Sequence, residues 1–514
     1  MRRVFSPAAI VSLFVWYGIV LSGNAQAAAR RPYGGDFKIA STGKIITTDP
    51  ALVSTTTELE LARQIHETLY RIAPDGTIVP ALAQQLPKVS QNRTELVIRL
   101  RPGLKFHDGS SISSSEVLAS WRRVLSASCA SEHWWLLAPI KGALEYRQGK
   151  STRVTGLERI NKLSFRIRLS SPMPNFIEAL AAVPTAPLPA RFLSSKEPKD
   201  AHPPGSGPFK WSVSRSTGES IVLDAFLGHC KGRPYLDRLS LVPYSSTRAA
   251  SLAFELEEVH ISYLRPSHRV GSHQVDNGPQ AWMTFLALNP KRLDQLPQGF
   301  HKAVANAVDR ESLVNYLVGD RGSPTDEVIG LPENKNTNRE LRANPKAAKE
   351  YFKKLALENM GIPPVLVFLV QKGQILDRPV AERIQVNLVD IGVVVSVIEL
   401  EREAFTKRIK AGEYDFFLAQ PLSLVRDHEL QLLSIVAKTS ENAEIEDLLQ
   451  SLNNLPGDSN RSAIVREMAR RYQIRLPWIP LFQHGRRVYL NKSVRGYKRS
   501  ATGLADLAEA WSVE

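Results

Sequence analysis

The sequence is poor in the features that mark disulfide scaffolds, membrane proteins and motif-bearing enzymes. Its 514 residues include only two cysteines, Cys129 and Cys230, so at most one internal bridge can form, and the sequence leaves open whether they pair. After the amino-terminal region, no apolar run approaches the roughly 20 residues that a membrane-spanning helix requires. The G-x-S-x-G, H-E-x-x-H and Walker A patterns are also absent. We therefore expect no catalytic residues, no metal and no cofactor.

The first residues predict export. Two arginines precede an apolar run over residues 8–21, and Ala25-Gln26-Ala27 has the small-x-small pattern of a cleavage site. Asn24 stands where a lipobox would need its lipidated cysteine, so a free protein is expected rather than a lipid-anchored one. We predict a signal peptide over 1–27 and a periplasmic mature chain, and amino-terminal sequencing of that chain should begin after Ala27.

Basic residues are in excess. Lysine and arginine outnumber aspartate and glutamate by 66 to 51, which gives a formal net charge of +15, and loss of the two arginines in the signal peptide lowers it to +13. The basic residues are scattered, with small groups only at Arg486-Arg487 and Lys498-Arg499. Because the chain is expected to be exported, we expect no nucleic-acid partner. The charge favours a diffusely basic surface, anionic ligands or anionic membrane surfaces.

The stretch over residues 95–125 carries the strongest local signals. Alternating apolar residues predict a strand over 95–100, which Pro102-Gly103 ends. Ser113 and Glu116 have the spacing of a capping box, in which each side chain satisfies a free backbone N–H at the start of a helix. The sequence therefore predicts a strand, a tight turn and a capped helix in immediate succession.

Two pairs of side chains in this part of the chain are candidates for a catalytic or metal-binding site. His107 and Asp108 are a candidate catalytic or metal pair, but an Asp-Gly turn that caps its own backbone is the better interpretation. Cys129 and His133 are four residues apart, which would place a thiol and an imidazole on one helix face. No further Cys or His lies nearby in the sequence, so a packed aromatic segment is preferred to a metal site.

Elsewhere the apolar pattern predicts several ordinary elements. A helix is predicted over 58–70. From residue 344 onward, predicted helices and strands alternate, which favours an α/β lobe with a substantially parallel sheet. Two further helices are expected before a strand around 478–482.

The order R-x-G-x-x-F-H-D-G over 101–109, followed by a helix with a tryptophan, resembles the signature of the family 5 extracellular solute-binding proteins, which deliver peptides, nickel and other solutes to ABC importers. Residues 75–83 match the family's D-G-x-x-x-P-x-L-A segment, and residues 303–313 match its A-x-x-x-A-x-D-R-x-x-[IL] pattern. The resemblance implies an α/β fold of the periplasmic-binding-protein type, with two main lobes plus an inserted third, hinged by two crossing strands near Trp282 and Leu481.

The resemblance also implies the division of the chain. The expected parts are the signal peptide (1–27), lobe I in three parts (28–75, 204–282 and 485–514), lobe II (76–203) and lobe III (283–484).

The function that the resemblance implies is capture of a peptide or peptide-like solute in an interlobe cleft and delivery to an ABC importer. The expected partners are the small-molecule or oligopeptide ligand and the permease and ATPase subunits, and the chain is expected to be a monomer. Two alternatives stay open. One is a periplasmic hydrolase whose scattered His and Asp residues meet in space, and the other is a ligand sensor or adaptor on the same fold without an importer.

Three segments correspond to cleft-lining positions in the family. The candidate ligand-binding residues are Ser41, Thr42, Gly43, Trp282, Gln420, Pro421, Leu422 and Ser423. Peptide binders of the family carry a Trp and then an Asp that pairs with the peptide amino group, where this chain has Pro421 and Leu424. Asp427 is a candidate replacement, and a surface pair of Asp427 with Arg426 is the competing interpretation. With the basic charge, this loss predicts a preference for anionic or amino-blocked peptides, or for another acidic solute.

Trp282 is the candidate with the largest contact area. If it is buried only when the lobes close on ligand, Trp282→Ala should weaken binding roughly tenfold, or about 1.4 kcal/mol, and leave the melting temperature of the free protein nearly unchanged. The competing interpretation is that Trp282 packs the hinge.

Overall fold

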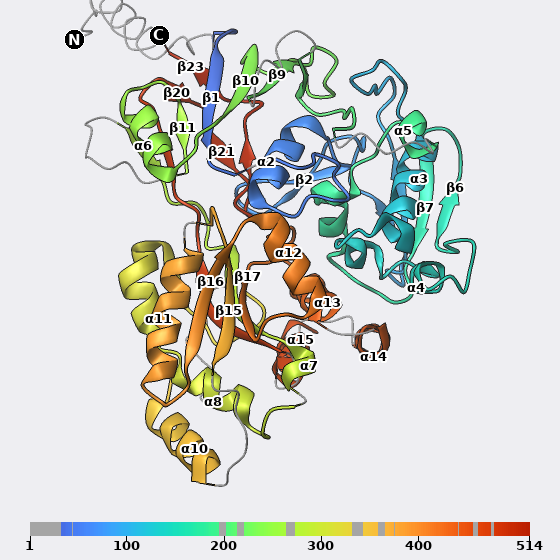
Figure 1. Cartoon of the computed structure of the whole chain (residues 1–514). Coiled ribbons are helices and arrows are strands. Elements are labelled where there is room, and N and C mark those ends of the chain that lie inside the picture. The colour runs from blue at the N-terminus through green and yellow to red at the C-terminus, as the bar shows by residue number, and fades with distance from the viewer. Residues whose placement is uncertain are drawn as a thin grey trace, which may run out of the picture.

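A computed structural model gives the three-dimensional structure of the chain (Figure 1). It describes residues 32–43, 45–194, 202–212, 220–263, 273–293, 295–330, 343–357, 365–374, 376–439, 442–455, 461–473 and 477–513. The predicted signal peptide and its cleavage site lie outside these residues. Figure 1 shows three lobes, two stacked one above the other and one beside the upper of these two.

A seven-stranded sheet forms the first lobe and draws its strands from distant parts of the chain. Its order is β12-β19-β11-β1-β10-β9-β8, in which β1 pairs in parallel with β10 and β11. The strands are β1 (Asp36–Ser41), β8 (Phe209–Trp211), β9 (Ile221–Ala225), β10 (Arg238–Pro243), β11 (Ile261–Ser262), β12 (Gln274–Asp276) and β19 (Val488–Leu490). Helices α2 (Thr56–Ile65) and α6 (Thr247–Glu255) pack against this sheet.

The helix predicted over 58–70 is shorter in the structure. Helix α2 begins with a capping box of Thr55 and Glu58 and ends at Ile65, and strand β2 (Tyr70–Ile72) follows soon after. The carbonyl oxygen of Ile65 accepts a hydrogen bond from the N–H of Gly207 at 2.7 Å. A Cβ at Gly205 would lie 2.0 Å from the same oxygen, so only glycine fits there. A tertiary contact with the Gly205-Ser206-Gly207 segment therefore replaces the next helical turn.

The second lobe contains the four-stranded sheet β4-β5-β7-β6 and helix α3 (Ser114–Leu125). Its strands are β4 (Lys88–Val89), β5 (Glu95–Arg99), β6 (Leu157–Arg159) and β7 (Ser164–Arg168). The predicted capping box is confirmed, because Glu116 Oε2 accepts the N–H of Ser113 at 2.9 Å and Ser113 Oγ caps the first turn. Trp121 is fully buried, and its Nε1–H donates to the Thr185 carbonyl at 2.9 Å. The local signals of the sequence thus produced the predicted strand and helix.

The third lobe is built on a six-stranded sheet of order β14-β18-β13-β17-β15-β16. The strands are β13 (Trp282–Leu288), β14 (Gly322–Pro324), β15 (Leu366–Gln371), β16 (Val395–Leu400), β17 (Phe416–Ala419) and β18 (Trp478–His484). Strands β15, β16 and β17, which come from the alternating stretch after residue 344, pair in parallel as predicted, whereas β13, β14 and β18 pair antiparallel, so the sheet as a whole is mixed. The reason is that β13 and β18, which bring the chain into and out of the lobe, pair antiparallel with each other.

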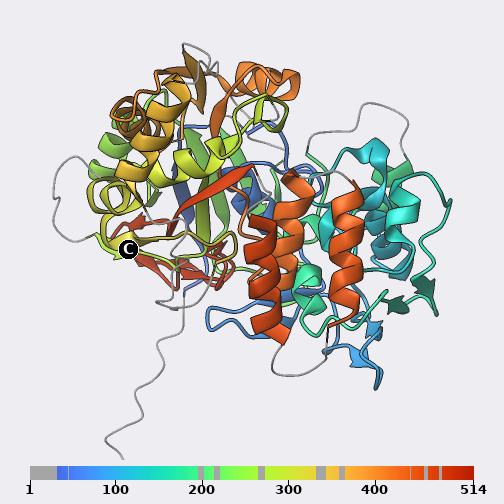
Figure 2. The ribbon, with the colours of Figure 1, turned by 90° about the horizontal axis from the view of Figure 1, so that it is seen from below.

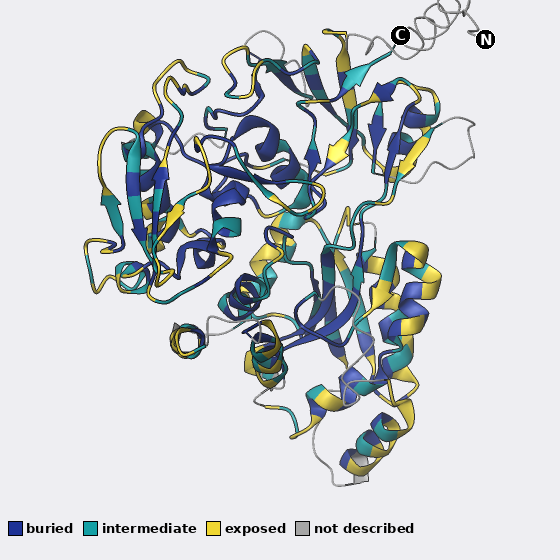
Figure 3. Ribbon diagram, turned by 180° about the vertical axis from the view of Figure 1, so that it is seen from behind, coloured by how far each residue is buried: buried dark blue, intermediate teal, exposed yellow. Residues whose placement is uncertain are grey.

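Helices α11 (Asp377–Val389) and α12 (Arg402–Ala411) pack on β15 and β16, and α8 (Phe300–Ala307) packs on α11 and on α10 (Pro345–Leu357). The short α9 (Arg310–Leu313) lies between α8 and α10 in the chain. Asn344 Oδ1 caps α10 by accepting the N–H of Ala347 at 3.1 Å. Figure 3 shows α10 and α11 with exposed outer sides and buried inner sides.

Three helices, not the two predicted, precede β18: α13 (His428–Thr439), α14 (Asn442–Asn453) and α15 (Arg461–Gln473). Figure 2 shows them side by side, next to the second lobe. Helix α13 contacts the short helix η2 (Trp134–Leu137) of that lobe, and their apolar side chains share one core. Arg461 bonds Glu429 at 2.5 Å and the Pro172 carbonyl at 2.9 Å, so these helices join the second lobe to the third.

Two short linkers connect the first and third sheets. The chain crosses from β12 to β13 through residues 277–281 and returns from β18 to β19 through residues 485–487. The linkers lie side by side, because Trp282 is paired with His484. A Cβ at Gly485 would lie only 2.6 Å from the Asn277 carbonyl oxygen, so glycine is required for this close approach. The two crossing strands that the sequence predicts are confirmed.

Candidate functional site

A cavity of about 860 Å³ lies between the first and third sheets. Its wall includes the end of β1 and the start of α2 from the first lobe, the chain after β15 and β17 and the start of α11 from the third, and the linker residues 484–487. Ligand sites for small molecules commonly have volumes of about 300–1,000 Å³ and lie at domain interfaces. The size and position of this cavity therefore suit a small solute or a short peptide.

The cavity wall is highly charged and carries both signs. Its described cationic side chains are Arg321, Lys372, Arg402, Arg486 and Arg487, and its acidic ones are Glu60, Asp377, Glu401 and Glu403. Several are already paired: Arg486 contacts Glu60 at 3.0 Å and Lys372 contacts Glu401 at 2.5 Å. Such a wall can receive a ligand that carries charges of both signs.

One ion pair links the two lobes beside the cavity. Arg402 at the start of α12 contacts Glu58 of α2 at 2.8 Å, and Glu58 is fully buried. Burial raises the pKa of Glu58, but Arg402 and the N–H groups of Ser54 and Ile46 outweigh it, so the pKa lies below its usual range. Glu58 therefore stays ionised and holds α12 against α2.

Asp377 differs from the other carboxylates of the wall. It opens helix α11, is only 4% exposed, and has no cationic partner among the described residues. Gln420 Nε2 donates to its Oδ1 at 2.9 Å, and the backbone N–H of Gln371 also donates to it. Burial raises the pKa of Asp377 to about 7 in spite of these hydrogen bonds. No local sequence pattern distinguishes Asp377 from the other acidic residues of the chain.

The structure brings five of the eight sequence-predicted residues to one wall. Ser41, Thr42, Gly43, Trp282 and Gln420 line the cavity. The other three, Pro421, Leu422 and Ser423, are not among its lining residues. The predicted segments are therefore placed around the cavity, but the third contacts it only through its first residue.

Asp427 does not supply the carboxylate that the sequence lacks at Leu424. Its Oδ1 accepts the N–H groups of Glu429 and Leu430 at 3.0 and 3.1 Å and so caps α13. Its Oδ2 accepts from Asn175 Nδ2 at 2.8 Å. These bonds hold Asp427 at the junction with the second lobe and outside the cavity wall.

The side chains of His107 and Asp108 form hydrogen bonds with backbone groups, in agreement with the predicted turn and not with a catalytic or metal pair. Asp108 Oδ1 accepts the N–H and hydroxyl of Ser110 at 2.9 and 2.6 Å. His107 Nδ1 accepts the N–H of Gly205 at 3.2 Å, which leaves Nε2–H to donate to the Gly207 carbonyl at 3.0 Å. The ring must therefore be neutral. Burial lowers the pKa of His107 to about 4, in agreement with this pattern.

The His107 contact predicts a dependence of stability on pH. In the unfolded chain a histidine takes up a proton near pH 6.5, whereas folded His107 resists it down to about pH 4. Between these values the folded state should lose about 1.4 kcal/mol per pH unit through this residue. His107→Phe removes the titration, so from pH 6.5 to 4.5 the wild type should lose about 2 kcal/mol more than the variant. Urea unfolding at three pH values measures this, and parallel losses in the two proteins would contradict it.

Cys129 and His133 do not share a helix face. Cys129 ends a short helix, and Ala130 then adopts a left-handed conformation with φ of 53°. His133 Nε2 lies 2.6 Å from the Val53 carbonyl. No disulfide joins Cys129 and Cys230 in the structure.

A second cysteine lies in a group with metal-binding geometry. Glu67, His229 and Cys230 have ligand atoms within 4.8 Å of one another. Both oxygens of Glu67, however, accept from the Arg71 guanidinium, at 2.8 and 2.6 Å. A bidentate arginine already neutralises this carboxylate, so the group is an ion-pair network rather than a metal centre.

Comparison with known proteins agrees with this architecture. The sequence model described as "Bacterial extracellular solute-binding proteins, family 5 Middle" matches residues 77–442. The chain is 22% identical over 489 residues to "Di/tripeptide-binding protein 2" of Pseudomonas aeruginosa, covering 87% of this chain and 89% of that protein.

Solved structures share the fold. The Escherichia coli murein tripeptide binding protein MppA superposes with a TM-score of 0.81 at 19% identity, over 93% of this chain and 98% of that one. The oligopeptide-binding protein AppA from Bacillus subtilis, solved with a nonapeptide, superposes with a TM-score of 0.77 at 18% identity, over 94% and 100%. Within the described residues, none of the helices has the length and apolar character needed to span a bilayer.

Proposed function

Because this chain belongs to the bacterial extracellular solute-binding proteins of family 5, we propose that it captures a peptide or peptide-like solute in the cavity between its first and third sheets. The solute would then pass to the permease and ATPase subunits of an ABC importer. The observation that carries the proposal is the cavity itself, whose charged wall is assembled from both lobes and from one of the two linkers that join them, residues 485–487.

The linkers supply the motion that such a function needs. Lobes joined by a few residues can rotate about them, and a ligand favours the closed form only through contacts that the open form lacks. The Glu58–Arg402 pair and the cavity wall each join residues of both lobes, so a ligand in the cavity would contact the two lobes at once. We expect the mature chain to act as a periplasmic monomer after loss of residues 1–27, without a cofactor.

Binding and turnover should be measured on one sample, because the hydrolase alternative predicts consumption of the ligand. The mature protein is unfolded, refolded to remove bound solute, and mixed with a pool of di- to pentapeptides. Native mass spectrometry should show a one-to-one complex, and the peptides should be recovered intact after prolonged incubation. Cleaved peptides would favour the hydrolase, and failure of every peptide to bind would contradict the proposed ligand class.

A further inference from the structure

Asp377 is an unusual residue for a stable protein interior. Burying a carboxylate is costly unless a cation or several hydrogen bonds compensate it. Asp377 is 4% exposed, and its described partners are one amide, Gln420 Nε2, and one backbone N–H, that of Gln371. Neither carries a positive charge, so the ionised form of Asp377 is incompletely compensated in the free protein.

The position of Asp377 allows a ligand to compensate its buried charge. Both Asp377 and its partner Gln420 line the cavity, so a group of the ligand can reach them. Asp377 begins a 13-residue helix that packs on β15 and β16, which holds its backbone in place. A carboxylate fixed at a cavity wall by hydrogen bonds is preorganised to receive a cation without rearrangement.

The other acids of the wall lack this combination. Glu60 and Glu401 already contact Arg486 and Lys372. Glu403 is exposed, so water can solvate its charge. Among the described acids of the wall, Asp377 alone is both buried and without a cation.

We propose that Asp377 receives a cationic group of the ligand, an ammonium group such as the free amino terminus of a peptide, with Gln420 orienting the carboxylate. The inference rests on the proposed function and names the chemistry of its ligand. It reverses the expectation from sequence that amino-blocked or purely anionic solutes bind better.

Binding through Asp377 should depend on pH. The carboxyl group must be ionised to hold a cation, so the affinity for an ammonium ligand should fall by up to tenfold per pH unit as the pH drops below about 7. Most charged groups on the neighbouring elements are already paired: Lys372 with Glu401, Arg378 with Glu382 and Glu399, and Arg402 with Glu58. Glu403 is exposed to solvent. The remaining titratable group is His484, which lines the cavity from β18. Burial lowers the pKa of His484 to about 4, so that ring stays neutral over the range of interest.

The test compares trialanine with N-acetyl-trialanine by calorimetry on the wild type and on Asp377→Asn. We expect the wild type to bind trialanine at least tenfold more tightly than the acetylated peptide, with affinity that falls from pH 7 to 5. Asp377→Asn should bind trialanine at least tenfold more weakly, lose the pH dependence, and bind the acetylated peptide as the wild type does. Glu382→Gln is the matched control, since Glu382 lies on the same helix, is 51% exposed and does not line the cavity.

A measurement without ligand separates this role from a structural one. If the Asp377 carboxylate has no cationic partner until ligand binds, its ionisation destabilises the free protein at pH 8. Asp377→Asn should then raise the melting temperature of the free protein at that pH. A lowered melting temperature, or equal affinity of the two proteins for trialanine, would overturn the inference and leave the proposed function standing. Failure of the wild type to bind either probe or any member of the peptide pool would contradict the proposed function itself.

Discussion

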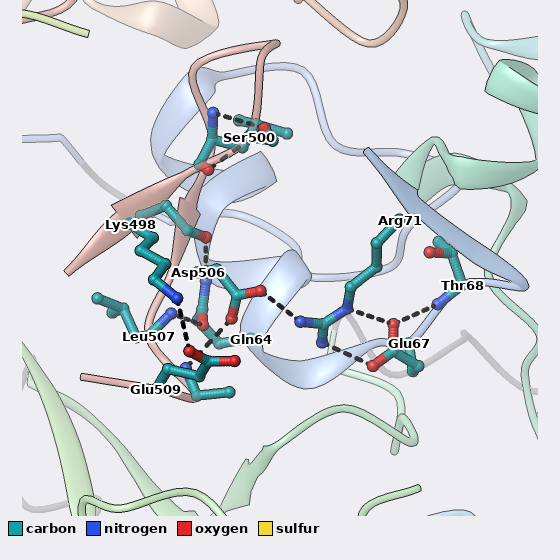
Figure 4. Close-up of polar contacts among 12 residues, drawn as sticks. Gln64, Glu67, Thr68, Arg71, Lys498, Ser500, Asp506, Leu507 and Glu509 are labelled. Carbon is teal, nitrogen blue, oxygen red and sulfur yellow. Dashed lines mark hydrogen bonds and ion pairs between the residues drawn. The ribbon is translucent and has the colours of Figure 1, made fainter. Parts of the chain in front are cut away.

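Replacing Glu67 by Gln should lower the free energy of unfolding by about 3–5 kcal/mol, because the change removes the bidentate one of the two carboxylates that pair with the buried Arg71 guanidinium. Glu67 is 1% exposed and accepts both Arg71 Nε and Nη2, and His229 Nε2 lies 2.8 Å from Oε2. Arg71 reaches on to Asp506 at 2.5 Å (Figure 4). The network thus joins three parts of the first lobe that are far apart in the sequence.

Gln64 of α2 also binds the carboxyl-terminal segment that contains Asp506. Its Nε2 donates to the Ala505 carbonyl at 3.0 Å, and its Oε1 accepts the N–H of Leu507 at 3.3 Å (Figure 4). Loss of Glu67 should therefore loosen the carboxyl-terminal segment from α2. Hydrogen exchange of residues 505–507 should increase in the variant.

An exposed pair beside the network provides the control for Glu67→Gln. Glu509 contacts Lys498 at 2.8 Å, and both side chains are 53% exposed. Exposed pairs contribute at most about 1 kcal/mol, so Glu509→Gln should have little effect on urea unfolding. Equal, small effects of the two substitutions would contradict the structural role of the buried network.

The pH dependence of the Glu67 effect has a definite sign. Burial raises the pKa of Glu67, but Arg71 and His229 outweigh burial, and the pKa lies well below its usual range. A depressed pKa gives stability that is fully present above the unfolded value of about 4.3 and is lost as the pH falls toward the folded one. The difference between wild type and Glu67→Gln should therefore be constant at neutral pH and narrow below about pH 4.

Trp282→Ala should lower the free energy of unfolding of the ligand-free protein by about 3–5 kcal/mol, the usual cost of truncating a buried aromatic side chain. The side chain is only 4% exposed without ligand, and the Arg486 guanidinium lies 5.9 Å from its ring. A Cβ at Gly503 would be 2.9 Å from Nε1, which shows how closely the backbone covers the indole. The expectation of an unchanged melting temperature is therefore replaced by a large decrease.

Trp282 also lines the cavity, so truncation should weaken trialanine binding at least tenfold in the protein that remains folded. Trp282→Phe separates the two effects, because it retains most of the apolar volume and removes an N–H that has no hydrogen-bond partner among the described residues. We expect Phe to cost less than about 1.5 kcal/mol of stability. Normal binding by folded Trp282→Ala would show that the residue only packs the hinge.

Much of the fold was predictable because several signals coincide in short stretches. The strand, turn and capped helix over 95–125 are specified by alternation, Pro-Gly and a capping box, and all three are local. The end of α2 was missed because a backbone hydrogen bond from Gly207, more than 140 residues away, decides it. The mixed order of the third sheet was missed for a similar reason, since β13 and β18 are distant in the sequence.

The candidate site was only partly predictable. Ser41 and Gln420 could be selected because the family resemblance places their segments at the cleft, and each stands at or just after the end of a strand that borders the cavity. Asp377 could not be selected, because an acidic residue in the first turn of a helix ordinarily only complements the helix dipole. Its burial and its contact with Gln420 arise because α11 packs on β15 and β16, and β17, which pairs with β15, ends just before Gln420; no local sequence pattern predicts this arrangement.

The central claim, that ligand binds between the first and third sheets, is tested most directly by hydrogen exchange of the mature protein alone and saturated with the peptide pool. We predict slower exchange in residues 39–43, 371–374 and 485–487, which line the cavity from both lobes and from the linker. Saturable binding that leaves all three segments unchanged, and protects only the second lobe, would contradict the claim.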